Sequence, residues 1–214
     1  YNKISNFAYE YNRDLYMKSM NLTGNSIKTN DFDFSFGWNY NSLNRGYFPT
    51  KGVKASLGGR VTIQGSDNKY YKLSADLQGF YPLDRDHRWV LSGKATASYA
   101  NGLGGKRVPF YQLYTAGGIG SLRGFAYGAV GPNAIYQDKY GQWYQSTDVV
   151  GGNAMATASV ELIVPTPFVG DKSQNSVRTS LFVDAASVWN TKWKSDRKGL
   201  PSSVTRSLPD YGKP

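Results

Sequence analysis

The chain has 214 residues, with no cysteine, one histidine and 25 basic against 15 acidic side chains, which gives a formal net charge of +10. This composition excludes a disulfide scaffold, a thiolate metal site and cysteine catalysis, and one histidine cannot supply a histidine zinc cluster. A mean hydropathy of −0.51 beside 17 Tyr, 10 Phe, 5 Trp and 24 Gly is unusual for a soluble core, and no apolar run approaches the ~18 residues that a membrane helix requires.

Seven segments alternate apolar and polar residues with the period of two that predicts β-strands. In chain order they are Ile4–Tyr11, Asp31–Tyr40, Val53–Gln64, Tyr70–Tyr81, Arg88–Tyr99, Ala154–Val164 and Val177–Trp189. The first is the weakest of the seven. In the other six, every charged residue falls on the same side as Ser, Thr, Asn or Gln, and the opposite side carries no charge. One face of the predicted sheet is therefore apolar.

The apolar face contacts either lipid or a protein core, and two observations favour lipid. Most of the segments have about ten to twelve residues, whereas strands of soluble sheets have about five or six and bilayer-spanning strands about ten. Aromatic residues gather at segment ends, as in the girdles of outer-membrane barrels; they are Trp38, Tyr40, Phe80, Tyr81, Trp89, Tyr99 and Trp189. The sequence thus predicts an all-β fold, a transmembrane antiparallel β-barrel, with a soluble β-sandwich as the alternative.

Seven strands do not close a bacterial barrel, for which an even number of at least eight is the rule, and open sheet edges are not viable in lipid. The chain is therefore interpreted as part of one larger barrel, and no linker composition divides it. Between Ala100 and Asn153 lies a connection far longer than an ordinary loop. Loops of this length are usually functional or disordered, so this connection is a candidate position for a site.

Four short motifs occur in order along the chain. They are Asn44–Thr50 (Asn-Arg-Gly-Tyr-Phe-Pro-Thr), Gly102–Lys106, Leu122-Arg123-Gly124-Phe125 and Pro165–Phe168. With them the chain resembles the outer-membrane protein assembly factors of Gram-negative bacteria and organelles, whose sixth extracellular loop carries a [Val/Ile/Leu]-Arg-Gly-[Phe/Tyr] tetrapeptide. The likeness spans essentially all 214 residues.

The resemblance implies a barrel of roughly sixteen strands that follows soluble periplasmic modules. Residues 1–214 are then a portion of one C-terminal barrel domain without the modules, and the long loop, about 105–153, is extracellular. The implied protein is not an enzyme, and it folds and inserts other β-barrel proteins into the bacterial outer membrane without ATP. Its expected partners are outer-membrane lipid, unfolded β-barrel clients and accessory lipoproteins of the assembly complex, with no cofactor, no metal and no nucleic acid.

Arg123 has the clearest chemistry in the long loop, because a guanidinium stays charged and binds carboxylates in a fixed fork geometry. Glu161 and Asp184 lie on the polar faces of two consecutive predicted strands, and these faces line the lumen if the apolar faces meet lipid. A loop that folds into the lumen can place Arg123 between them, and the resemblance implies the same docking on the inner wall. The expected docking set is Leu122, Arg123, Gly124, Phe125, Glu161 and Asp184.

Two other motifs are expected to form turns at the opposite, periplasmic edge of the barrel. Counting strands from the long loop places both of them on that edge. The residues expected in these turns are Arg45, Gly46, Tyr47, Pro165, Pro167 and Phe168.

Other functions have less support. No Ser/His/Asp arrangement is readable, so nothing favours a nucleophilic enzyme. The basic residues are spread over strands and loops, and we expect the one dense cluster, Lys192–Lys198, to be a solvated loop and not a nucleic-acid site. A two-partner secretion translocator, a passive outer-membrane channel and a soluble β-sandwich binding module remain as alternatives.

Overall fold

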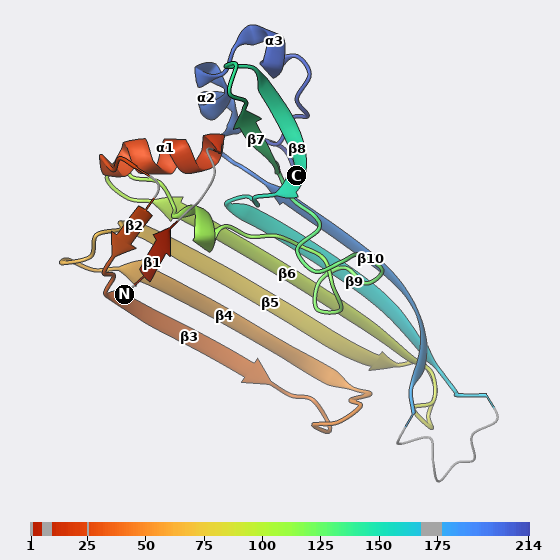
Figure 1. The fold of residues 1–214 in the computed structure, drawn as a ribbon. Helices are drawn as coiled ribbons and strands as arrows, with labels where there is room; N and C mark the ends of the chain where they lie inside the picture. The colour runs from red at the N-terminus through yellow and green to blue at the C-terminus, as the bar shows by residue number, and fades with distance from the viewer. Residues whose placement is uncertain (1, 6–9, 25, 168–176) are drawn as a thin grey trace.

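Six antiparallel strands form one curved sheet, the largest element of the structure (Figure 1). The computed structural model describes residues 2–5, 10–24, 26–167 and 177–214. The strands of the sheet are β3 (Asp33–Asn41), β4 (Gly52–Thr62), β5 (Tyr70–Pro82), β6 (Val90–Gly102), β9 (Ala154–Val164) and β10 (Thr179–Trp189). Each of them pairs with the next one of this set along the chain, so the spatial order is β3-β4-β5-β6-β9-β10.

The six stronger predicted strands correspond to these six, with bounds that differ by three residues or fewer. The pairing is continuous; β9 and β10, for example, pair along their whole length, with Ala154 opposite Trp189 and Val164 opposite Thr179. Because successive side chains point to opposite faces of a strand, this regular register keeps the apolar and polar faces separate across the sheet.

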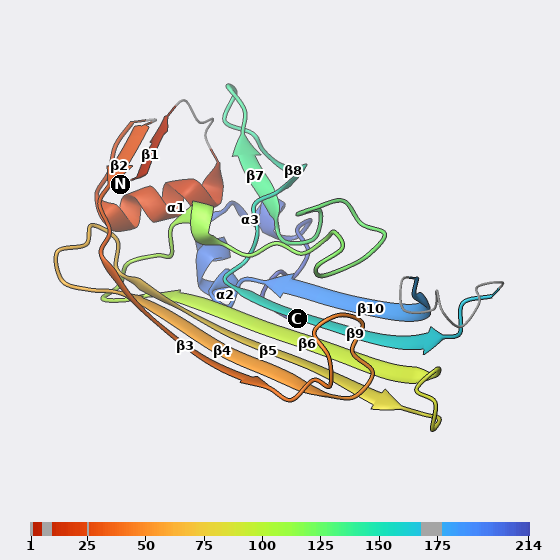
Figure 2. The ribbon, with the colours of Figure 1, turned by 90° about the horizontal axis from the view of Figure 1, so that it is seen from below.

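The apolar face, here called the outer face, is exposed. Phe34, Trp38, Leu57, Leu181 and Val183 have exposed fractions between 50% and 75%. Among the described residues no second layer covers this face, since the helices, the small hairpins and the long connection lie on the other side of the sheet or at its end (Figure 2). The outer face is therefore an apolar surface that does not pack into a protein core within the described residues. The opposite, polar face is called the inner face below.

The first predicted strand, Ile4–Tyr11, is wrong in its last two residues, 10 and 11, and separate from the main sheet. Strand β1 (Asn2–Ser5) pairs with β2 (Ser26–Thr29) in a two-stranded sheet of its own. Residues 6–9 lie outside the described residues, and Tyr11 already begins helix α1 (Tyr11–Met20). Six strands, and not seven, thus belong to the barrel-like sheet in the described part of the chain.

Helix α1 starts where it does because Glu10 caps it. The Glu10 carboxylate accepts hydrogen bonds from the backbone N–H groups of Asn12 (3.0 Å) and Arg13 (2.9 Å). Such bonds satisfy donors that have no partner inside the helix. At the other end Asn21 adopts the left-handed conformation (φ 54°) that commonly terminates helices. The capping residues therefore override the alternation of aromatic residues in this segment.

The long connection between β6 and β9 is more ordered than a loop. It contains a 3₁₀ turn, η1 (Phe110–Gln112), and a β-hairpin formed by β7 (Asn133–Gln137) and β8 (Trp143–Val149). A bridge pairs Tyr114, which follows the 3₁₀ turn, with Gly152, which lies just before β9. This bridge closes a loop of residues 114–152 within the connection.

The segment after β10 forms short helical turns. They are α2 (Trp193–Asp196), η3 (Arg197–Gly199) and α3 (Ser202–Thr205). The expectation of a solvated loop over Lys192–Lys198 is wrong, because Trp193 and Asp196 are each only 2% exposed. An indole that packs into a core holds this basic stretch against the protein.

Helix α1, the β7–β8 hairpin and residues 190–214 pack together at one end of the sheet (Figure 1), and we call this unit the cap. Its core consists of Tyr11, Ile135, Trp193 and Leu200, which come from all three parts. Within the described ranges, no helix combines the length and the apolarity needed to cross a membrane. The cap therefore lies beyond the ends of the strands as a small hydrophobic unit of its own.

Candidate functional site

The candidate site begins in the long connection, which folds against the inner face of the sheet. Leu122 is 8% exposed and pairs with Gly118 in a short bridge. Gly117 has φ +124°, and a Cβ at this position would lie 2.2 Å from the carbonyl oxygen of Ala126. Only glycine fits such a close approach. The Ser121 hydroxyl completes this tight turn, because it accepts from Gly117 N–H (2.8 Å) and donates to Gly117 C=O (3.1 Å).

Arg123 follows this turn and binds Asp184 of β10. Its Nε donates to Asp184 Oδ2 at 2.8 Å and its Nη2 donates to Asp184 Oδ1 at 2.7 Å, which is the bidentate fork expected of an arginine. The backbone N–H of Arg123 donates a third bond to Asp184 Oδ2 at 3.0 Å. The Asp184 side chain is only 5% exposed. One carboxylate therefore holds both the side chain and the backbone of the loop.

Three further side chains complete the contact surface of the guanidinium. Nη1 donates to Glu161 Oε2 at 3.2 Å and Nη2 donates to Ser159 Oγ at 2.9 Å. The ring of Phe182 lies against the guanidinium, with its centroid 3.5 Å from Cζ, as in a cation–π contact. We call Ser159, Glu161, Phe182 and Asp184 the arginine cup.

The register of β9 and β10 explains why the cup has this shape. Ser159 lies directly opposite Asp184, and Glu161 lies directly opposite Phe182. Directly opposed residues of an antiparallel pair have neighbouring side chains on the same face. Two such pairs, adjacent along the hairpin, give a charged fork, a hydroxyl and an aromatic surface within reach of one guanidinium.

The electrostatics of the site keep Arg123 charged. Hydrogen bonds from the guanidinium to Asp184, with the negative charges of Asp184 and Glu161 close by, raise the pKa of Arg123 above its already high usual value. Beside the cup lies a hollow of about 130 Å³ on the inner face. At its rim the Lys94 ammonium donates to the carbonyl oxygen of Gly120 at 3.0 Å, which adds a second contact between wall and loop.

The structure brings Arg123 into contact with both Glu161 and Asp184. Leu122 is buried behind it, and Gly124 adopts φ +85° in the turn that follows. Phe125 takes part through its backbone, whose carbonyl accepts from Gly118 N–H at 3.0 Å, while its side chain is 55% exposed. The docking on the wall is thus carried by the arginine and not by the aromatic residue of the tetrapeptide.

Sequence reasoning missed Ser159 and Phe182. Both lie on the polar side of their strands, and Phe182 stands between Ser180 and Asp184 on that side. An aromatic residue in an otherwise polar row was the available signal. Its role becomes visible only when the loop supplies the cation.

The residues expected in the two turns lie together at the edge of the sheet opposite the cap. In the first turn the Asn44 side chain accepts from the backbone N–H of Thr50 at 3.1 Å, and Thr50 Oγ1 lies 2.9 Å from His87 Nδ1 of the neighbouring turn. The Arg178 guanidinium donates to Pro49 C=O at 2.8 Å and lies over the Phe48 ring.

These turns border a cleft of about 410 Å³ on this edge. Its lining includes Arg45 and Pro165, while Tyr47 is 71% exposed and its ring lies tilted by 32° against that of Phe48. Gly46 and Pro167 lie in the same two turns, and Phe168 lies outside the described residues. The turns of three hairpins thus meet at one edge of the sheet.

Known proteins match the chain over most of its length. The Omp85 superfamily domain matches residues 1–208 of the chain. The outer membrane protein assembly factor BamA of Neisseria meningitidis serogroup B (strain ATCC BAA-335 / MC58) is 34% identical over 175 residues, which are 81% of this chain and 21% of that protein. The crystal structure of BamA from Haemophilus ducreyi lacking POTRA domains 1–3 is similar with a TM-score of 0.93 and 52% identity, over 99% of this chain and 40% of that one. The chain therefore spans well under half of the length of either relative.

Proposed function

The chain belongs to the Omp85 superfamily, and from this we propose that it is part of the membrane barrel of an outer-membrane protein assembly factor. The whole protein folds and inserts other β-barrel proteins into the bacterial outer membrane without ATP. Two relatives with the name BamA, one of them named as an assembly factor, support this proposal. The proposed partners are unfolded β-barrel clients, the accessory lipoproteins of the assembly complex and outer-membrane lipid.

Within that protein, residues 1–214 are proposed to form a portion of one barrel domain. The outer edges of β3 and β10 have no pairing strand among the described residues, and unpaired edges are not viable in hydrocarbon. Further strands of the same protein therefore continue the sheet on both sides. The outer face contacts lipid, the long connection and the cap are extracellular, and the three turns opposite them are periplasmic.

The observation that carries the proposal is the docking of Arg123 in the arginine cup. It pins a long extracellular loop inside the lumen and plugs part of it, which an open passive channel does not need. The guanidinium binds Asp184 in a bidentate fork at 2.7–2.8 Å, and the Asp184 side chain is only 5% exposed. Removal of either partner would leave the other without its main counter-charge. Removal of one partner of a buried ion pair costs about 3–5 kcal/mol.

The test is client insertion by the full-length protein in liposomes. We expect Arg123→Ala to lower both the unfolding midpoint of the barrel and the rate at which an unfolded β-barrel client becomes protease-protected and heat-modifiable. Arg206→Ala, at an exposed arginine of the cap, is the control and leaves both unchanged. Arg123→Lys keeps the charge without the fork and gives an intermediate rate.

Two results would contradict the proposal. If Arg123→Ala retains wild-type stability and wild-type insertion, the docking has no role in assembly. If the full-length protein instead passes an unfolded substrate into the vesicle interior and leaves none in the bilayer, the protein is a translocator of the two-partner secretion type.

A further inference from the structure

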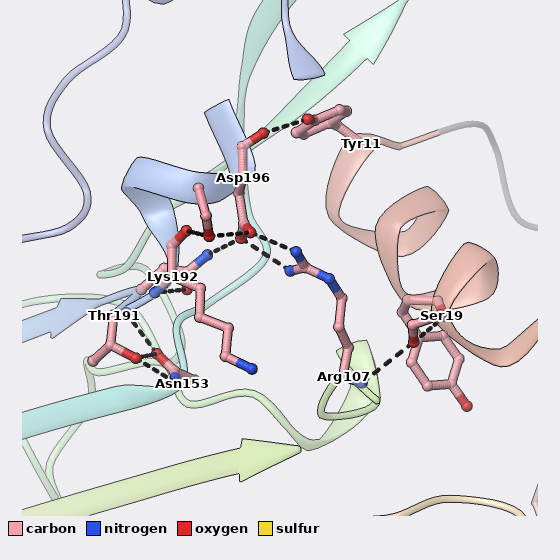
Figure 3. A network of polar contacts seen from close by, with 10 residues as sticks. Tyr11, Ser19, Arg107, Asn153, Thr191, Lys192 and Asp196 are labelled. Atoms are coloured by element: carbon pink, nitrogen blue, oxygen red, sulfur yellow. Dashed lines mark hydrogen bonds and ion pairs between the residues drawn. The ribbon is translucent and has the colours of Figure 1, made fainter. Parts of the chain in front are cut away.

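A second arginine of the long connection binds a second aspartate, outside the arginine cup. Arg107 lies near the start of the connection, and its Nη1 and Nη2 donate to Asp196 Oδ2 and Oδ1 at 3.0 and 2.5 Å (Figure 3). The Asp196 side chain is completely buried and Arg107 is 26% exposed. This is again a bidentate pair on a carboxylate that water does not reach.

Asp196 also binds the helix of the cap. The Tyr11 hydroxyl, in the first turn of α1, donates to the backbone carbonyl of Asp196 at 2.5 Å, and Asn190 Nδ2 donates to Asp196 Oδ2 at 3.0 Å. Figure 3 shows Asp196 between Tyr11 on one side and Arg107 on the other. One residue thus connects α1, the long connection and the segment after β10.

The other end of α1 is fixed to the same part of the long connection. The Ser19 hydroxyl accepts from Arg107 N–H at 3.2 Å, and the Ser19 carbonyl accepts from Lys106 Nζ at 2.7 Å. Helix α1 is therefore held at its first turn by Asp196 and at its last turn by Lys106 and Arg107. If Arg107 and Asp196 move apart, α1 must lose its hydrogen bonds at one of these two ends.

We propose that the Arg107–Asp196 pair is a latch that keeps the cap closed over the extracellular end of the lumen. The long connection is then held at two points. The inner point is the contact of Arg123 with Asp184 of β10. The outer point is the contact of Arg107 with Asp196, which lies twelve residues after Asp184 in the chain. The cap opens when the outer point releases, while the inner point keeps the loop on the wall.

The chemistry of the pair makes the latch a two-state device. The guanidinium and the buried carboxylate are stable together, and loss of the guanidinium alone leaves the charge of Asp196, whose side chain is 0% exposed, without its cation. Intermediate positions are therefore disfavoured. Once Asp196 and Arg107 both reach water, the charges are hydrated and the open state no longer carries this penalty.

The test is ion conduction by the full-length protein in planar bilayers, which needs no client and is therefore independent of the proposed assembly function. We expect Asp196→Asn and Arg107→Met each to raise the frequency of open-channel events by roughly tenfold or more. Asp210→Asn breaks an exposed pair with Lys213 in the same segment and serves as the control with wild-type conduction. The reversed pair Arg107→Asp with Asp196→Arg restores part of the closure.

A labelling measurement separates opening from loss of the cap fold. Residues 1–214 contain no cysteine, so Leu200→Cys, at a position 7% exposed in the cap core, reports access of a maleimide to the cap. We expect labelling to be slow with the latch intact, faster with Asp196→Asn, and slow again with the reversed pair.

Two outcomes overturn the latch. In the first, Asp196→Asn conducts and labels like the Asp210→Asn control, so the pair does not hold the cap. In the second, both single variants and the reversed pair open to the same extent, so the site is merely a packed part of the cap whose charges have no role in closure.

Discussion

At the scale of single residues, the two carboxylates of the arginine cup are not equivalent. Asp184 accepts three bonds from Arg123, one of them from the backbone, and its side chain is 5% exposed. Glu161 accepts one bond at 3.2 Å and is 25% exposed. Partly hydrated pairs contribute little, whereas a buried carboxylate with several charge-assisted bonds contributes much more.

The asymmetry gives a prediction about rank. We expect Asp184→Asn to lower the free energy of unfolding of the barrel by about 3 kcal/mol or more, and Glu161→Gln by about 1 kcal/mol or less. Urea unfolding of the full-length protein in lipid, followed by tryptophan fluorescence, measures both. Equal losses, or a larger loss with Glu161→Gln, would show that the guanidinium relies on Glu161 as its main partner.

At the scale of elements, the sequence was most informative where the side-chain period was strict. Strand β9 was predicted with its observed bounds, because the central residues, 156–162, alternate strictly between apolar and polar. Helix α1 was not predicted, since a ten-residue helix gains most of its stability from packing, and its partners are remote. Tyr16, for example, is 1% exposed and donates to Asn68 Oδ1 at 2.6 Å.

The candidate site divides in the same way. The contact of Arg123 with Glu161 and Asp184 could be predicted from the sequence. The loop carries a guanidinium, and the predicted lumen faces of two consecutive strands carry carboxylates of opposite charge. Phe182 could not, since its place under the guanidinium depends on where the loop crosses the wall. The burial of Asp196 was equally hidden, because its partner Arg107 is 89 residues away.

The residue that caps the N-terminus of α1, Glu10, gives a prediction about pH. Burial raises the pKa of Glu10 above its usual 4.5, against the bonds from Asn12 and Arg13 that favour the carboxylate. A folded-state pKa above the unfolded value stabilises the fold fully below pH 4.5, and this contribution is lost as the pH rises through the folded-state pKa. Hydrogen exchange of α1 amides, corrected for intrinsic rates, should therefore show less protection as the pH rises through this window.

Glu10→Gln tests the assignment. The amide is neutral at every pH, so the protection of α1 in this variant should no longer fall as the pH rises from 4.5. The variant also loses the charge at the helix start, so its absolute protection is not the readout. Parallel pH profiles for both proteins would contradict the role given to Glu10.

At the scale of the whole molecule, one sheet separates two solvents. Its outer face is apolar and uncovered among the described residues, and its inner face carries the long connection and the arginine cup. In a bilayer this arrangement gives each strand a lipid side and a lumen side that differ at every second residue. The cap lies on the lumen side of the sheet, as Figure 2 shows.

Adjacent residues of β4 test the two solvents directly. Leu57 is 50% exposed on the outer face near the middle of the strand, and Ser56 points to the inner face. We expect Leu57→Arg to cost about 2–4 kcal/mol of stability in lipid and Ser56→Arg much less. Unfolding titrations of the full-length protein in bilayers measure the difference. A similar cost at both positions would argue that the outer face does not meet hydrocarbon.

The pairing of Ser159 with Asp184 and of Glu161 with Phe182 has a consequence for the order of assembly. A slip of one residue between β9 and β10 would turn the side chains of one strand to the opposite face. The guanidinium would then lose either Ser159 and Glu161 or Phe182 and Asp184. The loop can therefore settle only on a hairpin that has already zipped correctly. Docking of Arg123 therefore depends on the correct register of the two strands that it binds, and a docked loop indicates that these strands are correctly paired.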